Sequence, residues 1–76
     1  MIKTVHDKKY QALLRYLRTA RESQGITVTE MSELIGETFQ IVSKIETGIR
    51  KLSVHEYVQY CTALGIDPSE GIELLK

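Results

Sequence analysis

Residues 34–51, LIGETFQIVSKIETGIRK, hold the pattern that decides the fold. An eight-residue segment, FQIVSKIE, lies between two glycines, Gly36 and Gly48, and a threonine suited to capping a helix precedes it. Within the segment, Val42 and Ile45 are three residues apart, which is the spacing of one helical face. The stretch therefore predicts a short helix with one face toward a core and a polar face opposite.

A second short helix is predicted directly before it. Thr27 is followed three residues later by Glu30, and this spacing is typical of a capping box that starts a helix. Gly36 is placed to end the helix in a left-handed conformation. Its expected inward residues are Met31, Ser32 and Ile35. Two short helices joined by a tight turn make a helix-turn-helix over residues 27–46, and the second helix of that motif is the usual DNA reader.

Three further helices flank this motif. An earlier one is predicted between Asp7 as N-cap and Gly25 as stop, because its apolar residues repeat on one face: Tyr10, Leu13, Leu14, Leu17 and Ala20. A later one begins at the capping box of Ser53 and Glu56 and ends at Gly65. Its expected apolar face is Val54, Tyr57, Val58, Cys61 and Leu64.

The fifth helix is short and begins near Asp67, with a proline at the first position, where that residue fits best. No segment alternates with the period of a β-strand. The sequence therefore predicts an all-α fold of five short helices, and we expect residues 1–76 to form a single domain.

The charge of the chain is zero overall but unevenly distributed. Residues 1–24 carry six basic and two acidic side chains, a net charge of +4, whereas residues 25–46 and 54–76 each carry −3. Arg50 and Lys51 add a short basic run between the two acidic segments. A locally basic face is therefore compatible with the neutral total.

Several classes of function are disfavoured by the residues. The single cysteine, Cys61, excludes an internal disulfide and is best explained as a small core residue. His6 and His55 are far apart, and no ligand spacing around them suggests a metal site. No nucleophile–base arrangement can be placed from the sequence, and the glycines match no phosphate-loop pattern, so we expect no enzyme, cofactor or metal. No signal peptide or membrane span of about 20 apolar residues is found, which favours a cytoplasmic protein.

A spaced set of residues across four helices resembles the phage-repressor (Cro/XRE-like) helix-turn-helix family, over residues 14–66. The residues that carry the resemblance are Leu17, Arg18, Arg21, Gly25, Ile26, Thr27, Met31, Ser32, Ile35, Gly36, Val42 to Glu46, Gly48, Arg50, Ser53 and Ala63 to Gly65. The resemblance implies a lambda-repressor-like DNA-binding domain of a bacterial or phage transcriptional regulator. It further implies a homodimer that acts as a repressor on a palindromic operator.

The resemblance also implies roles for individual residues. The family's recognition helix faces DNA at the positions of Thr38, Phe39, Gln40, Ser43 and Lys44. Phosphate contacts fall at Thr47, Arg50 and Lys51, and a structural salt bridge falls at Arg21 and Glu46. This chain departs from the family at Val28, where a phosphate-binding glutamine is common, at Phe39, where a polar residue is common, and at Leu52, which replaces a frequent proline.

The residues themselves support a DNA-facing surface but leave alternatives open. Phe39, Gln40, Ser43 and Lys44 share the outer face of the third helix, which an ordinary solvated surface would also explain. Phe39 suits a thymine methyl group, or packing against the preceding helix. The helix N-termini at Thr27 and Thr38 can offer backbone N–H groups to phosphates.

The carboxyl-terminal segment is rich in apolar residues for one short helix. We expect part of it to form a dimer interface made by Ile66, Ile72, Leu74 and Leu75. The partners expected are double-stranded DNA and a second copy of the chain. An antitoxin-like or adaptor domain, whose main partner is a protein, is the alternative.

Overall fold

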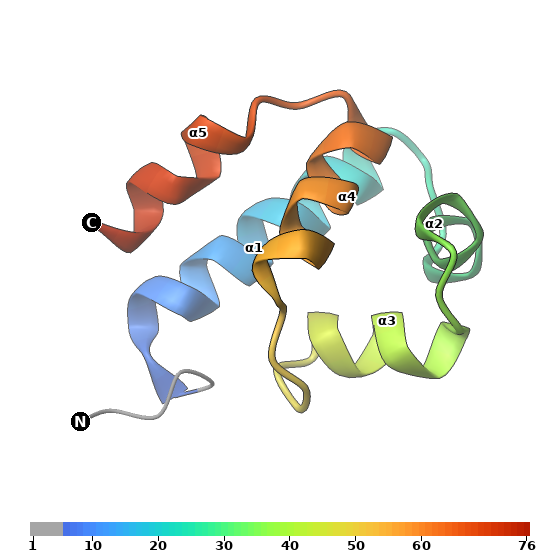
Figure 1. The fold of residues 1–76 in the computed structure, drawn as a ribbon, viewed down its shortest axis with the longest axis horizontal. Helices are drawn as coiled ribbons and strands as arrows, with labels where there is room; N and C mark the ends of the chain where they lie inside the picture. Colours follow the sequence, from blue (N-terminus) through green and yellow to red (C-terminus); the bar gives the residue numbers. More distant parts are fainter. Residues whose placement is uncertain (1–5) are drawn as a thin grey trace.

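The computed structural model describes residues 6–76, and in this range the chain forms α-helices and no strand (Figure 1). Lys3, one of the basic residues counted above, lies outside this range. The fold class is the predicted one, with five short α-helices and a final 3₁₀ turn: α1 (Lys8–Ser23), α2 (Val28–Ile35), α3 (Phe39–Glu46), α4 (Val54–Leu64), α5 (Pro68–Ile72) and η2 (Glu73–Leu75).

The helix ends are fixed by the local signals seen in the sequence. Both capping boxes form: the backbone N–H of Glu30 donates to Thr27 Oγ1, and that of Glu56 donates to Ser53 Oγ, each at 3.1 Å. Gly36 ends α2 with a φ of 72°, a left-handed backbone that any Cβ would strain. This turn sets the direction in which α3 leaves α2.

The core lies between α1, α2, α3 and α4. Its fully buried side chains come from all four of these helices: Leu17, Met31, Val42, Ile45, Tyr60 and Cys61. A smaller cluster of Tyr10, Leu14 and Ile45 joins α1 to the end of α3. Because Val42 and Ile45 are held at 0% and 1% exposure, α3 is fixed to the core by one face and presents the other outward.

The predicted apolar face of α4 is wrong at two positions. Val54 and Val58 are 82% and 45% exposed, whereas Tyr60, which was not predicted, is fully buried. The buried stripe runs through Tyr57, Tyr60, Cys61 and Leu64, at the spacing i, i+3, i+4, i+7. Tyr60 can occupy the interior because its hydroxyl donates to Glu46 Oε2 at 3.1 Å, which satisfies its polar end.

The last elements pack back onto the first. The hydroxyl of Tyr57 donates a hydrogen bond to the carbonyl oxygen of Pro68. Gly71 packs closely beside it, because a Cβ added at Gly71 would lie 2.5 Å from the Tyr57 hydroxyl oxygen and 3.0 Å from Leu13 Cδ1. η2 then lies against α1, and Ile72 and Leu75 line an apolar groove with Tyr10. Ile72 and Leu75 therefore lie on one side of this terminal segment.

Candidate nucleic-acid interface

The outer face of α3 presents a mixed surface with no carboxylate in its first turn. Phe39 is 50% exposed, Gln40 and Lys44 are exposed, and Ser43 is partly buried. Phe39 therefore lies outside the two core clusters, with half of its surface open to solvent. The structure places these four predicted side chains on one helix whose opposite face is anchored.

The amino terminus of α3 is suited to an anion. The N–H of Ile41 donates to Thr38 Oγ1 at 3.3 Å, while the N–H groups at the start of a helix have no partner within it. The helix dipole adds a partial positive charge at this end. Thr38 is exposed, so a phosphate can approach these donors.

The amino terminus of α2 is less suited to an anion, although Thr27 was expected to offer donors there. The N–H of Thr27 already donates to Glu30 Oε1 at 3.1 Å. That backbone hydrogen bond lowers the pKa of Glu30, so the carboxylate stays charged at the helix end. A phosphate near Thr27 would meet this negative charge, which weakens the assignment of Thr27 relative to Thr38.

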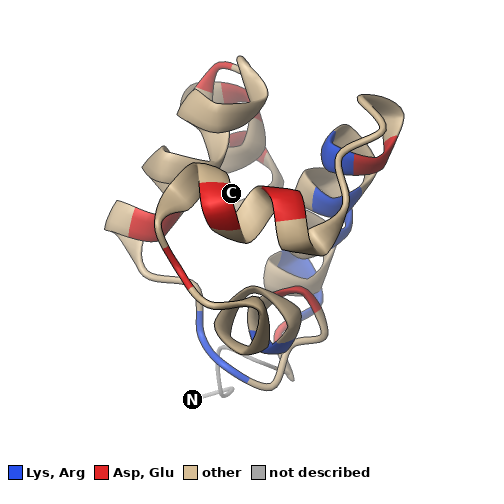
Figure 2. Ribbon diagram, turned by 90° about the vertical axis from the view of Figure 1, so that its right-hand side faces the viewer, with Lys and Arg blue, Asp and Glu red and all other residues tan. Residues whose placement is uncertain are grey.

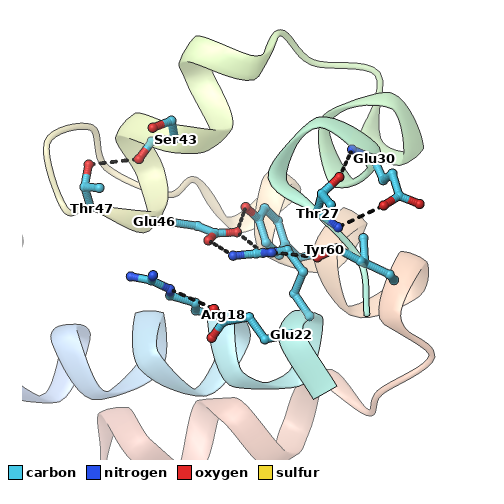
Figure 3. Close-up of polar contacts among 10 residues, drawn as sticks. Arg18, Glu22, Thr27, Glu30, Ser43, Glu46, Thr47 and Tyr60 are labelled. Atoms are coloured by element: carbon cyan, nitrogen blue, oxygen red, sulfur yellow. Dashed lines mark hydrogen bonds and ion pairs between the residues drawn. The ribbon is translucent and has the colours of Figure 1, made fainter. Parts of the chain in front are cut away.

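The expected pair of Arg21 and Glu46 is present and joins α1 to the end of α3. Arg21 Nε donates to Glu46 Oε2 at 2.9 Å and Nη2 to Oε1 at 2.8 Å, and both side chains are less than a tenth exposed. Figure 3 shows Glu46 reaching from α3 toward Tyr60, whose hydroxyl donates to the same carboxylate. A further bond from Arg21 Nη1 to the carbonyl of Ile26, at 2.6 Å, leaves the buried guanidinium well paired.

The charges of this pair are mutually stabilised. Burial lowers the pKa of Arg21, but the hydrogen bonds to Glu46 outweigh this and raise it above its ordinary value. Burial acts in the opposite direction on the neutral Tyr60 hydroxyl and raises its pKa, so the hydroxyl keeps the proton that it donates to Glu46. The carboxyl-terminal end of α3 is therefore held in place by a satisfied polar cluster.

A second ion pair, which the sequence did not predict, lies just after α3. Arg50 Nη1 lies 2.9 Å from Glu56 Oε2 and donates to Oε1 at 3.0 Å, and the N–H of Ser53 donates to Oε1 at 2.9 Å. Burial raises the pKa of Glu56, but the bonds from Ser53 and Arg50 prevail and lower it. The capping-box spacing in the sequence indicated that Glu56 caps α4. The ion pair of Glu56 with Arg50 crosses an irregular loop, and no residue spacing indicated it.

The remaining phosphate candidates differ in what they can donate. The hydroxyl of Thr47 donates to the carbonyl of Ser43 at 2.8 Å, as drawn in Figure 3, so its proton is already used within α3. Lys51 is exposed and forms no ion pair among residues 6–76. Lys51 is therefore the better phosphate ligand of the two.

The basic residues lie mainly along α1 and in the loop after α3 (Figure 2). In Figure 2, blue segments follow α1 and the loop after α3, and red segments lie on α2, where Glu30 and Glu33 are exposed. Lys44 adds a basic residue near the end of α3. The surface formed by α3 and the loop after it is therefore locally basic in a chain of zero net charge.

The expected dimer residues do not form one set. Ile66 is partly buried and packs against the core, whereas Ile72, Leu74 and Leu75 are each about two fifths exposed. Ile72 and Leu75 line the groove beside α1, and Leu74 does not.

Among residues 6–76, no group of three or more potential metal ligands gathers, and no helix has the length and apolar character to cross a membrane.

Comparisons with known proteins agree with this architecture. Residues 17–71 match a family model described as helix-turn-helix. The HTH-type transcriptional regulator y4wC of Sinorhizobium fredii, itself uncharacterized, is 38% identical over 57 residues, which is 75% of this chain and 40% of that protein. The chain thus spans less than half the length of this curated relative.

Two solved structures are also similar. The XRE-family like protein from Pseudomonas syringae pv. tomato is 38% identical with a TM-score of 0.83, and the match covers 92% of this chain and 85% of that one. The clp gene regulator ClgR from C. glutamicum is 25% identical with a TM-score of 0.78, over 91% of this chain and 90% of that one.

Proposed function

The chain belongs to the helix-turn-helix family of XRE-like transcriptional regulators, and on that premise we propose that it binds double-stranded DNA sequence-specifically through the outer face of α3. Its relatives are transcriptional regulators and not enzymes. We further propose that it acts in the cytoplasm as a dimeric repressor, which occupies promoter DNA at a palindromic operator.

The observation that carries the proposal is the two-sided construction of α3. One side is locked into the core by Val42 and Ile45, and the other presents Phe39, Gln40 and Lys44 to solvent. A short helix held this way has a fixed orientation, which reading of base edges in the major groove requires. The helix amino terminus, free of acidic residues in its first turn, can approach the DNA backbone.

The side chains on this surface divide into two chemical classes. Gln40 can donate and accept together, which matches N6 and N7 of adenine, and Lys44 offers donors that match O6 and N7 of guanine. Lys51 and Arg50 follow the helix, and we assign them to phosphates, which add affinity without sequence information. We assign Phe39 to contact with a thymine methyl group.

The proposal is tested by titrating the protein against the DNA upstream of its own coding sequence. A scrambled duplex of equal length and composition serves as the control, and both titrations are repeated at several salt concentrations. We expect a discrete complex on the upstream DNA about a thousandfold tighter than on the scrambled duplex. Nonspecific affinity should be modest because the net charge is zero.

Equal affinity for both duplexes at every salt concentration would contradict sequence-specific binding. The alternative function, an antitoxin-like or adaptor domain with a protein partner, would then take precedence. A specific complex that contains one protein chain instead of two would support sequence-specific binding. It would contradict the proposal that the protein binds a palindromic operator as a dimer.

A further inference from the structure

We propose that the cleft between α1 and the end of α3 is a phosphate-binding site, with Arg15 and Arg18 as its ligands. It lies apart from the base-reading face of α3 and adds to the contacts assigned to Arg50 and Lys51. Two sources of phosphate fit the same chemistry, the backbone of a DNA duplex and a free phosphorylated small molecule. The first source rests on the proposed function, and the second does not.

The cleft has a volume of about 390 Å³ and lies between one side of α1 and the residues that end α3. Residues from both segments line it, among them Leu14, Arg15, Arg18, Glu46, Thr47 and Gly48. Figure 3 shows Arg18 extending from α1 on the side that faces Glu46 and Thr47. Because Thr47 and Gly48 directly follow α3, the cleft adjoins the surface that we assign to DNA.

The charge that remains unbalanced in the cleft is positive. Glu46 is the only carboxylate among the described residues that line it. Both oxygens of Glu46 already accept hydrogen bonds, Oε1 from Arg21 and Oε2 from Arg21 and Tyr60. Glu46 is therefore balanced within the protein and does not neutralise Arg15 or Arg18.

Arg15 and Arg18 are available to an outside anion. They are three residues apart on one side of α1, a spacing at which like charges repel slightly. Arg15 is exposed and forms no ion pair within residues 6–76. Arg18 is 3.6 Å from Glu22, but both side chains are 55% exposed, so water screens the pair and an anion can displace Glu22 at little cost. An anion in the cleft would relieve the repulsion between the two arginines.

The two residues that follow α3 contribute shape to the cleft and no free donor. The N–H and the hydroxyl of Thr47 both donate to the carbonyl of Ser43. The N–H of Gly48 donates to the carbonyl of Ile45. Leu14 adds an apolar surface. Recognition of an anion therefore depends on the guanidinium groups, which substitution can remove one at a time.

Two arginines suit a phosphate better than a carboxylate. A carboxylate has two oxygens, and one guanidinium can bond to both, as Arg21 does for Glu46. A phosphate group is tetrahedral, and its oxygens can accept from two guanidinium groups that approach from different sides. The position of the cleft beside the DNA-facing surface also makes phosphate the anion that the proposed function brings near.

The first experiment titrates the free protein with inorganic phosphate and with pyrophosphate, at an ionic strength held constant with sodium chloride. The NMR signals of the arginine Nε–H groups report binding, and we expect a saturable shift in the wild type. Arg15→Gln should weaken binding about tenfold, because one charged donor is lost. Lys76→Gln removes the same charge from an exposed residue that does not line the cleft, and it should leave binding unchanged.

The second experiment measures DNA affinity at several salt concentrations. If the duplex backbone occupies the cleft, Arg15→Gln should lower the slope of log affinity against log salt by about one unit, on operator and scrambled duplex alike. Arg15→Lys keeps the charge and loses the planar fork of donors, so it should restore the slope but not the full affinity. Circular dichroism verifies folding, and Arg18→Gln replaces Arg15→Gln if that variant does not fold.

The two experiments distinguish the sources of phosphate. A saturable shift with an unchanged DNA slope supports a small-molecule ligand, and a lowered slope without a shift supports the DNA backbone. The site is refuted if neither effect is seen, or if Lys76→Gln changes either measurement as much as Arg15→Gln does. Specific DNA binding with neither effect would refute the cleft and leave the proposed function intact. Phosphate binding by a protein that does not distinguish operator from scrambled duplex would do the reverse.

Discussion

Two arginine–glutamate pairs lie near the carboxyl-terminal end of α3, and they are built differently. Arg21 and Glu46 are 7% and 6% exposed, and two guanidinium nitrogens meet two carboxylate oxygens. Arg50 and Glu56 are 41% and 8% exposed, and every side-chain bond that Arg50 makes within residues 6–76 uses Nη1. The first pair is closed on all sides, and the second leaves part of its guanidinium facing solvent.

This difference shows how one chemical pair can serve two purposes. A buried pair contributes little net stability over an apolar one, but losing one partner leaves an uncompensated charge in the interior. A pair with an exposed arginine is screened by water, so its loss costs little and its cation can bind a second anion. We therefore assign Arg21 to the fold alone, and Arg50 both to the cap of α4 and to a DNA phosphate.

The largest expected effect comes from breaking the buried pair. Glu46→Gln removes the charge that balances Arg21 and weakens the acceptor used by Tyr60, so unfolding should become easier by about 3–5 kcal/mol. Urea denaturation followed by circular dichroism measures this change. The matched control is Glu22→Gln, which affects the pair with Arg18 that is 55% exposed on both sides and should cost less than about 1 kcal/mol.

Equal effects of Glu46→Gln and Glu22→Gln on the free energy of unfolding would contradict the comparison. The pair of Arg21 and Glu46 would then contribute no more than a surface contact, and another interaction would have to hold the end of α3.

The next effect concerns DNA and sharpens the second half of the comparison. Arg50→Met should weaken binding to every sequence alike and lower the slope of log affinity against log salt by about one unit, because one phosphate contact is lost. Lys51→Ala should behave in the same way. Arg21→Met, measured below its melting temperature, should leave the salt slope unchanged. If the slope of log affinity against log salt is unchanged in Arg50→Met, Arg50 does not contact a phosphate, and its role is limited to the ion pair with Glu56.

The smallest effect is the contribution of Glu56 to stability and its dependence on pH. Glu56→Gln keeps an acceptor for Ser53 and removes the charge, so it should cost up to about 1 kcal/mol at neutral pH. The folded chain lowers the pKa of Glu56 below its ordinary value of 4.5, so the carboxylate stabilises the fold above that pH. The difference between wild type and variant should shrink as the pH falls through the lowered value. Thermal melts at a series of pH values measure it, and a difference that grows in acid would be the wrong sign.

The sequence predicted those parts of the fold that depend on neighbours along the chain. Caps such as Thr27 with Glu30, and left-handed stops such as Gly36, involve residues a few positions apart, so their spacing carries the information. The outer face of α3 followed from the same reasoning, because Val42 and Ile45 fix its orientation.

What the sequence did not predict depends on contacts between distant segments. The apolar residues of α4 allow two overlapping stripes, and packing against the other helices, with the hydrogen bond from Tyr60 to Glu46, turns Tyr60 inward and leaves Val58 outward. The bond of Arg50 to Glu56 depends on the path of an irregular loop, and no periodic pattern describes such a path. The pairing of Arg21 with Glu46 was available from family resemblance, but not from spacing.

The central claim, that the outer face of α3 reads bases, is tested most directly by binding of Gln40→Ala to operators with single base-pair substitutions. Glu33→Ala, an exposed residue on the outer face of α2, serves as the control. We predict that Gln40→Ala costs about 1–3 kcal/mol on the intact operator and loses discrimination at one base pair of each half-site, while Glu33→Ala keeps the wild-type pattern. If Gln40→Ala lowers affinity by the same factor for every substituted operator, Gln40 does not read a base, and the assignment of this face to the major groove is contradicted.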